Sequence, residues 1–296
     1  MPTIEENRSA WGEIYNWPDA GEEWSKRWGS AHMQWYGSIL PRISAFLPAD
    51  TILEVAPGYG RWTAFLKDLC KRLIVVDLAE RCIDRCRRRF ADCSHISYFV
   101  NDGKSLEMVV DGGVDFIFSF DSLVHAEEDV LKAYTAEFAK KLRPNGVAFI
   151  HHSNLGEYIH RIEAEARLSK IPKLLGMLKR LGIREKLSDS SRASSMTAGK
   201  MATFAEEYNL QCVSQELVTW GSRFTLTDCL STLVPRGSRW SRQNRVLRNP
   251  GFVLEAERIS ELSRLYDWPL PPIGTKRGKG ESLEGANEPS DLALSR

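Results

Sequence analysis

The chain has 296 residues, of which 43% are hydrophobic, and its 40 basic residues nearly balance its 39 acidic ones. This length and apolar fraction suffice for one large or two small domains, and the near-neutral charge argues against a nucleic-acid partner. No apolar run approaches the roughly 20 residues of a membrane span, and the first residues lack the basic-then-apolar order of a signal peptide, so we expect a cytoplasmic protein.

Residues 1–48 precede the first predicted strand and are rich in tryptophan: Trp11, Trp17, Trp24, Trp28 and Trp35. We expect a helical cap packed on a sheet, because large aromatic rings bury much area per residue. Flat rings with a polar edge also suit the face of a sugar. One or two of these tryptophans are therefore expected to line a substrate site.

The most informative pattern is an apolar strand at residues 51–55 that leads directly into a glycine turn. Gly58 and Gly60 lie in this turn, and a helix is predicted to begin near Arg61. Glycine has no Cβ, so the backbone turns tightly and lies close to a ligand. A strand followed by such a turn indicates that a nucleotide-like cofactor binds here.

The next strand, residues 73–76, ends at Asp77, and carboxylates in this position bind ribose hydroxyls. The dinucleotide fingerprint G-x-G-x-x-G is incomplete, because its third glycine falls on Thr63 or Arg61 depending on the start. The sequence therefore argues against a nicotinamide cofactor.

The strand and turn instead resemble motif I of class I S-adenosylmethionine-dependent methyltransferases, acid-x-Gly-x-Gly-x-Gly. Glu54, Gly58 and Gly60 match this motif, and Ala56 replaces its first glycine. The resemblance continues at residues 99–103, where the family places an acidic residue on the adenine amino group. It implies S-adenosylmethionine as cofactor and the following binding residues: Glu54, Ala56, Pro57, Gly58, Gly60, Asp77, Leu78, Asn101, Asp102, Gly103 and Phe120.

The later elements also follow this family's order. They are a strand at 114–120, a helix at 127–141, Leu-Arg-Pro-Asn-Gly at 142–146, a strand at 147–150, a helix at 204–208, and strands at 210–218 and 224–233. The resemblance implies a Rossmann-like α/β sheet of seven strands, the last one antiparallel.

The remaining segments are predicted to surround this sheet. Amphipathic spacing in residues 156–201 predicts a helical insertion after the fifth strand, where such enzymes commonly build a lid. Arginines at every third position from Arg236 to Arg248 predict a helical stripe, either a solvated face or a phosphate-binding one. We therefore divide the chain into a cap at 1–48, a methyltransferase domain at 49–235 with the lid at 156–201, a helical extension at 236–268 and a disordered tail at 269–296.

Three histidines follow predicted strand ends, where open α/β sheets bind their ligands: His125, His151 and His152. Imidazole titrates near neutral pH and would remove the proton of an acceptor hydroxyl. His152 and His151 rank ahead of His125, because adjacent residues leaving a strand point to opposite sides and at least one should face the pocket. Asp121 is expected to orient the base or bind the substrate.

A metal site is not expected. The six cysteines include no C-x-x-C pair, so reduced structural thiols are predicted rather than zinc ligands. Some methyltransferases of this fold use Mg²⁺ that is held by acidic and amide side chains near the strand ends. Asp121, His152 and Asn154 would imitate such a ligand set. Only one of the three is a carboxylate, and Mg²⁺ prefers more oxygen ligands.

Over its whole length the chain resembles sugar O-methyltransferases found with bacterial polysaccharide genes. The resemblance lies in Trp24-Ser25, Trp28-Gly29, residues 54–62, 120–125 and 151–155, Arg192-Ala193 and residues 227–229. It implies a sugar hydroxyl of a glycan or nucleotide sugar as acceptor. Two alternatives stay open: a small-molecule O- or N-methyltransferase of secondary metabolism, which the Trp-rich cap would serve equally well, and a non-catalytic scaffold, which the intact cofactor residues argue against. The sequence leaves the oligomeric state open.

Overall fold

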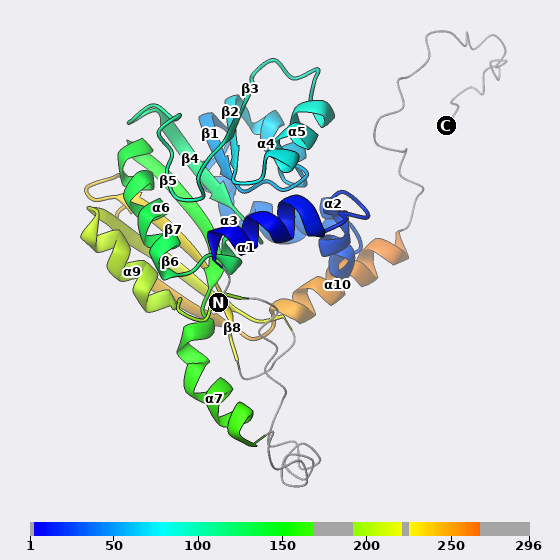
Figure 1. Ribbon diagram of the computed structural model, residues 1–296, viewed down its shortest axis with the longest axis vertical. Coiled ribbons are helices and arrows are strands. Elements are labelled where there is room, and N and C mark those ends of the chain that lie inside the picture. The colour runs from blue at the N-terminus through cyan, green and yellow to red at the C-terminus, as the bar shows by residue number, and fades with distance from the viewer. Residues whose placement is uncertain (1–2, 169–191, 221–224, 267–296) are drawn as a thin grey trace, which may run out of the picture. The chain divides into compact units, whose positions relative to one another are not determined.

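An eight-stranded sheet organises the part of the chain that the computed structural model describes, residues 3–168, 192–220 and 225–266 (Figure 1). The strands lie in the order β3-β2-β1-β4-β5-β7-β6-β8. All pairs are parallel except those that β7 makes with β5 and β6. The strands are β1 Ala49–Val55, β2 Cys70–Asp77, β3 Ile96–Val100, β4 Val114–Ser119, β5 Leu142–Ser153, β6 Leu210–Val218, β7 Asp228–Pro235 and β8 Arg245–Asn249.

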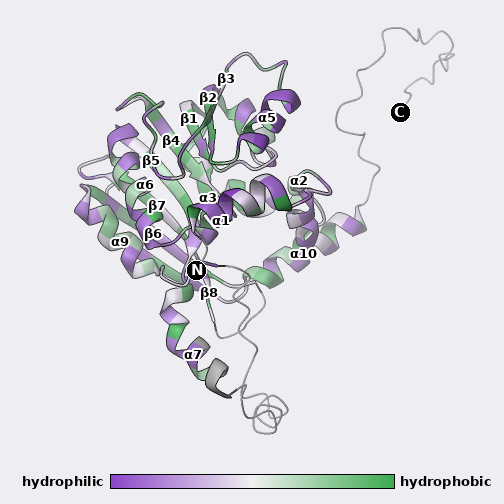
Figure 2. Ribbon diagram, in the orientation of Figure 1, coloured by the Kyte–Doolittle hydropathy of each residue, from purple (hydrophilic) through white to green (hydrophobic). Residues whose placement is uncertain are grey.

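Helices cover both faces of the central strands, which is why these strands are apolar almost without interruption. Alternate residues point to opposite faces, so Ile52 and Leu53 of β1 belong to two different cores. Figure 2 shows the hydrophobic strands inside and hydrophilic outer helix faces. The α-helices are α1 Ile4–Ser9, α2 Ala31–Gln34, α3 Leu40–Ile43, α4 Thr63–Leu66, α5 Glu80–Arg89, α6 Glu128–Lys141, α7 Ile159–Leu168, α9 Ala198–Glu207 and α10 Phe252–Leu265.

The N-terminal segment packs on one face of the sheet together with α10. Trp28 and Trp35 are fully buried there and share a core with Phe252 of α10. The opposite core contains Phe138 of α6 and Met201 of α9. The two ends of the chain's described part thus contribute to the same layer.

Strand β5 is longer than expected. The predicted strand stops at residue 150, whereas β5 continues to Ser153 because β7 pairs antiparallel with it, His151 opposite Leu230 and His152 opposite Cys229. The two histidines therefore lie within the sheet and not in a loop beyond it.

The prediction of a helix in the arginine repeat from Arg236 to Arg248 is wrong. The chain turns at Gly237 (φ +83°) and then forms β8 beside β6, which raises the strand count from the predicted seven to eight. Asn249-Pro250-Gly251 ends the strand, and the predicted helical extension begins only at α10. A short edge strand with exposed residues carries no apolar alternation, so the spacing of three was misleading.

Several other expectations concern the chain as a whole. All six cysteines are free thiols, as predicted. None of the helices in the described ranges is long and apolar enough to cross a membrane. The predicted tail and most of the predicted lid, residues 169–191, lie outside the described residues, and the proposed domain boundaries stay predictions.

Gly60 supports the packing of α5, which gives a stability test. A Cβ at Gly60 would lie 2.6 Å from Cε2 of the buried Phe90, and φ is +80°. We expect Gly60→Ala to lower the free energy of unfolding by roughly 2–5 kcal/mol, from left-handed strain plus overpacking. Urea denaturation measures this loss.

The matched control is Gly237→Ala, because Gly237 has φ +83° and nothing within 4 Å of a built Cβ. It should lose only the conformational part, about 1–2 kcal/mol. Equal losses in the two variants would contradict the packing role of Gly60.

Candidate active site

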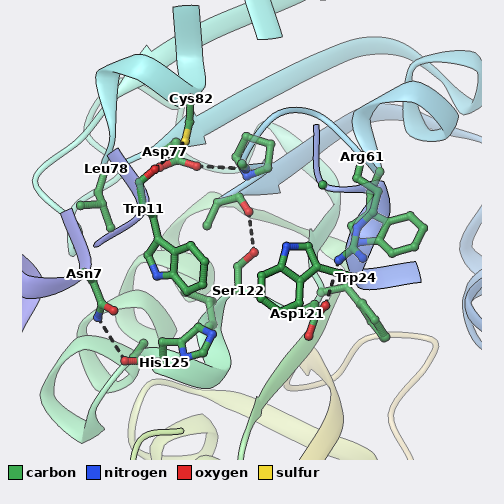
Figure 3. A pocket seen from close by; sticks show the side chains of 18 of the residues that line it. Asn7, Trp11, Trp24, Arg61, Asp77, Leu78, Cys82, Asp121, Ser122 and His125 are labelled. Atoms are coloured by element: carbon green, nitrogen blue, oxygen red, sulfur yellow. Dashed lines mark hydrogen bonds and ion pairs between the residues drawn. The ribbon is translucent and has the colours of Figure 1, made fainter. Parts of the chain in front are cut away.

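A cavity of about 570 Å³ lies at the carboxyl ends of β1, β2 and β4. Open α/β sheets place their ligands at this edge. The N-terminal segment contributes Trp11, Trp17 and Trp24 to its lining, and Figure 3 shows Trp11 and Trp24 among the lining side chains together with Asp77 and Asp121. Segments far apart in sequence therefore form one site.

The turn after β1 forms one wall of the cavity through Ala56, Pro57 and Gly58. Ala56 adopts φ +58°, the conformation that the family's first glycine would adopt without strain. Its N–H donates to the carbonyl of Val76 at 2.7 Å, and its carbonyl accepts from the Ser122 hydroxyl at 2.7 Å. Alanine is thus held in the conformation that the motif requires.

Asp77 lines the cavity beside this turn. One carboxylate oxygen accepts the N–H of Gly58 at 3.2 Å and the other accepts the N–H of Ala79 at 2.9 Å. Burial raises the pKa of Asp77 to about 6, although these two hydrogen bonds oppose the shift. Leu78 and Gly103 continue the wall, so an acidic acceptor stands beside apolar surface. This combination fits a ribose with its attached base.

Three predicted cofactor residues are not part of the lining: Glu54 and Asn101 are buried, and Asp102 is exposed. Glu54 is buried, its carboxylate accepts from the Thr63 hydroxyl at 2.5 Å, and burial raises its pKa to about 8. The Asn101 amide donates to the Tyr134 hydroxyl at 3.0 Å and accepts the N–H of Gly103 at 3.1 Å. The Asp102 carboxylate accepts hydrogen bonds from the backbone N–H groups of Lys104 and Ser105, at 2.8 and 2.7 Å. These residues shape the turn and loop that line the cavity.

Gly60 also lies outside the lining, and the expectation that its missing Cβ makes room for a ligand is not supported. The space above it is filled by Phe90 and by Cys86. Gly58 differs, because a Cβ there would lie 2.5 Å from the ring of Trp17. Trp17 in turn stacks on Tyr59, with ring centroids 4.6 Å apart.

The sequence-based ranking of the histidines is wrong, because neither His151 nor His152 lines the cavity. Both are fully buried. His152 bonds the carbonyl of Ser153 and the hydroxyl of Ser231, both at 2.8 Å, and burial lowers its pKa to about 4. His151 accepts the backbone N–H of Asp121 at 3.0 Å through Nδ1 and bonds Asp228 through Nε2 at 3.1 Å. Both nitrogens of each ring are already hydrogen-bonded within the protein, so neither ring is placed to take a proton from a bound substrate.

His125, ranked last, is the histidine that lines the cavity. It lies in the turn at Leu123–His125, where its backbone carbonyl accepts from the Asn7 amide at 3.1 Å. Its ring centroid is 5.1 Å from that of Trp11 (Figure 3). The cap thus holds the imidazole at the cavity surface.

Asp121 and Phe120 line the cavity as predicted from the end of β4. Asp121 adopts φ +67° and its carboxylate accepts from the Arg61 guanidinium at 2.9 Å. Arg61 also donates to the Ser25 hydroxyl at 3.2 Å and lies 4.4 Å above the Trp62 ring. Arg61 was expected only as the start of a helix, so this ion pair was not predicted.

The tryptophans of the cap divide between packing and the cavity. Trp28 and Trp35 pack in the core, whereas Trp11, Trp17 and Trp24 line the cavity, more than the one or two expected. Trp220 and Arg192 also line it and were not predicted as site residues. The only sequence signal for Arg192 was the resemblance of Arg192-Ala193 to sugar O-methyltransferases. No sequence signal pointed to Trp220 as a site residue.

The side chains considered for Mg²⁺ are engaged elsewhere. Asp121 pairs with Arg61, His152 is bonded within the sheet, and Asn154 bonds Leu226 and Ala198 at 2.8 Å each. Within the described residues, no group of three or more His, Cys, Asp or Glu side chains is arranged to hold a metal ion.

Comparison with known proteins agrees with this geometry. A family model described as a methyltransferase domain matches residues 52–146. Nodulation protein S of Sinorhizobium fredii is 34% identical over 106 residues, which cover 33% of this chain and 45% of that protein. Phosphoethanolamine N-methyltransferase 1 of Triticum aestivum is 28% identical over 118 residues, 38% of this chain and 24% of that protein. The matched segment therefore spans less than half of either relative.

A solved structure shares the fold. The S-adenosylmethionine-dependent methyltransferase of Leishmania major superposes with a TM-score of 0.52 at 13% identity, covering 78% of this chain and 82% of that one. The predicted Rossmann-like methyltransferase fold is confirmed, with one strand more than expected.

Proposed function

Because the chain carries a class I S-adenosylmethionine-dependent methyltransferase domain, we propose that it transfers a methyl group to a hydroxyl of a carbohydrate acceptor, a glycan or a nucleotide sugar. One observation carries the proposal: a single cavity joins the Asp77 wall to the wall formed by His125 and Asp121. Cofactor and acceptor would meet inside it. The proposal keeps the cytoplasmic location expected from the sequence.

The residues around Asp77 would hold the cofactor. The Asp77 carboxylate would accept hydrogen bonds from ribose hydroxyls, Leu78 and Gly103 would contact the base, and the turn at Ala56 and Gly58 would contact the rest of the cofactor. When bound, S-adenosylmethionine supplies a methyl group made electrophilic by its sulfonium. The protein then has to hold the acceptor in line and accept its proton.

The opposite half of the cavity suits a sugar. The rings of Trp11, Trp24 and Trp220 offer flat apolar faces, and the Arg61–Asp121 pair offers hydrogen-bond donors and acceptors beside them. A carbohydrate presents an apolar ring face edged by hydroxyls, which matches both features. His125 lies in the same wall, and neutral imidazole accepts a hydroxyl proton near pH 7.

An amine acceptor of a small molecule is the second candidate. It is favoured by the name of the wheat relative, an N-methyltransferase, and by the Asp121 carboxylate, which would attract an ammonium group. An ammonium group would first lose a proton to become the nucleophilic neutral amine, so this reaction would need a proton acceptor as well.

The deciding experiment is a transfer assay with S-adenosylmethionine labelled in its methyl group. Acceptors are a bacterial polysaccharide and nucleotide-sugar extract, a set of phenols and a set of amines, with and without chelator. We expect label in a carbohydrate fraction. Label only in amines or phenols would establish the alternative, and cofactor binding without any transfer would favour a scaffold.

Asp77 gives a prediction for the cofactor half. Asp77→Asn should weaken binding of S-adenosylhomocysteine at pH 7.5 by about 10-fold or more, since a charged hydrogen-bond acceptor is lost. Isothermal calorimetry measures this. Asp84→Asn, on the outer side of α5, should bind like the unchanged protein.

The same carboxylate makes binding depend on pH. The pKa of Asp77 is about 6, so the carboxylate is ionised above this pH and gains a proton below it. A ligand that needs the ionised form loses affinity as pH falls, approaching about tenfold per unit below pH 6. The Asn variant should show no such slope, and an equal slope in both proteins would remove Asp77 from the site.

His125 gives a prediction for the chemical step. His125→Ala should lower kcat for a hydroxyl acceptor by about 10²–10⁴-fold, the usual contribution of a general base, with cofactor affinity unchanged. His160→Ala is the control, because His160 is exposed on α7 away from the lining. Unaltered kcat in His125→Ala would exclude His125 as the base.

A further inference from the structure

One buried carboxylate, that of Asp228, bonds three side chains at or behind the proposed acceptor half of the cavity. Asp228 is the first residue of β7 and is fully buried. It accepts three hydrogen bonds from the Arg192 guanidinium, two at 2.9 Å and one at 3.2 Å, and one from the indole N–H of Trp220. Nε2 of His151 lies 3.1 Å from the same carboxylate. The three partners come from three separate segments of the chain.

Each of these partners leads to the cavity. Arg192 and Trp220 line it directly. His151 does not, but its Nδ1 accepts the backbone N–H of Asp121 at 3.0 Å, and Asp121 lines the cavity with φ +67°. A non-glycine residue in this conformation needs support from its surroundings. His151 supplies this support from behind.

The hydrogen bonds of His151 indicate which of its ring nitrogens carries the proton. Because Nδ1 accepts an N–H, the ring proton lies on Nε2 and donates to Asp228, so the imidazole is neutral. A second proton on Nδ1 would remove the bond to Asp121. Burial by itself would raise the pKa of Asp228, but the Arg192 charge and the His151 hydrogen bond outweigh burial and hold that pKa well below its usual range.

We propose that Asp228 is the positioning residue of the acceptor subsite: it fixes Arg192 and Trp220 directly and Asp121 through His151. What the subsite binds rests on the proposed function. Three arginines line the cavity: Arg192 pairs with Asp228 and Arg61 with Asp121, whereas Arg27 donates to the carbonyl of Trp220 at 2.8 Å. The two pairs offer fixed hydrogen-bond donors and acceptors with little net charge, which suits a hydroxyl-bearing group of the acceptor.

Two readouts test the positioning role without an acceptor. In protein labelled with ¹⁵N-histidine, His151 should show the Nε2–H form, and Arg192→Gln should shift its ring-nitrogen signals because both side chains share one carboxylate oxygen. In uniformly ¹⁵N-labelled protein, the signal of the Asp121 backbone amide should shift as well. Arg143→Gln is the matched control, since Arg143 pairs with Asp115 at the opposite end of the strands. Unchanged His151 and Asp121 signals in Arg192→Gln would overturn the proposal.

Asp228→Asn tests the consequence for turnover. S-adenosylhomocysteine affinity should stay within about twofold, because Asp77 is untouched, whereas kcat/KM for the acceptor found by the transfer assay should fall at least tenfold. Equal turnover in this variant would contradict the proposal. If the variant does not fold, Trp220→Phe removes one donor from the same carboxylate, and the same NMR signals decide. Failure of the sugar assignment leaves these signals unaffected, so the two outcomes are distinguishable.

Discussion

Two residues in the left-handed conformation, Ala56 and Asp121, fix the geometry of this cavity. Neither is a glycine, so each costs roughly 1–3 kcal/mol that its surroundings must offset. Ala56 is held by Val76 on one side and by the Ser122 hydroxyl on the other, and Asp121 is held by His151. Because Ser122 follows Asp121 directly, the loops after β1 and β4 support each other. The proposed cofactor wall and the proposed acceptor wall are therefore held in fixed positions relative to each other.

The proposed acceptor half of the cavity contains charged side chains that are almost fully buried. Arg61 is 8% exposed in its side chain, Arg192 is 12% exposed and Asp228 is not exposed. Removing one member of such a pair typically costs about 3–5 kcal/mol, while the intact pair contributes little net stability. Stability alone therefore does not account for these pairs. Fixed guanidinium and carboxylate groups at a cavity wall instead select the orientation of a polar ligand, which is the role that the proposed reaction requires.

Local patterns were enough to predict several residues of the cavity lining. An apolar strand, a glycine turn and a strand ending in Asp77 are short-range signals, and the structure places Gly58, Asp77 and Leu78 in the lining. The bounds of β6 also match the predicted strand at residues 210–218. Glu54 was read as a ligand contact, yet burial of its whole side chain places it behind the turn. A motif position does not state on which side of the backbone a side chain lies.

The acceptor half could not be predicted in this way, because its geometry depends on partners distant in sequence. The length of β5 is set by pairing with β7, and this pairing took His151 and His152 into the sheet. Arg192 meets Asp228 across 36 residues. Edge strand β8 depends on the open side of β6 rather than on its own sequence.

The cap explains why the histidine ranked last is the one at the cavity. Asn7 and Trp11 belong to a segment that precedes the first strand, and they hold His125 from across the cavity by a hydrogen bond and a ring contact. Trp17 covers the glycine turn from the same segment. One covering segment therefore contacts the proposed cofactor wall and the candidate base together. The position of His125 and the covering of the glycine turn thus depend on the same residues of the cap, which local patterns around either element do not reveal.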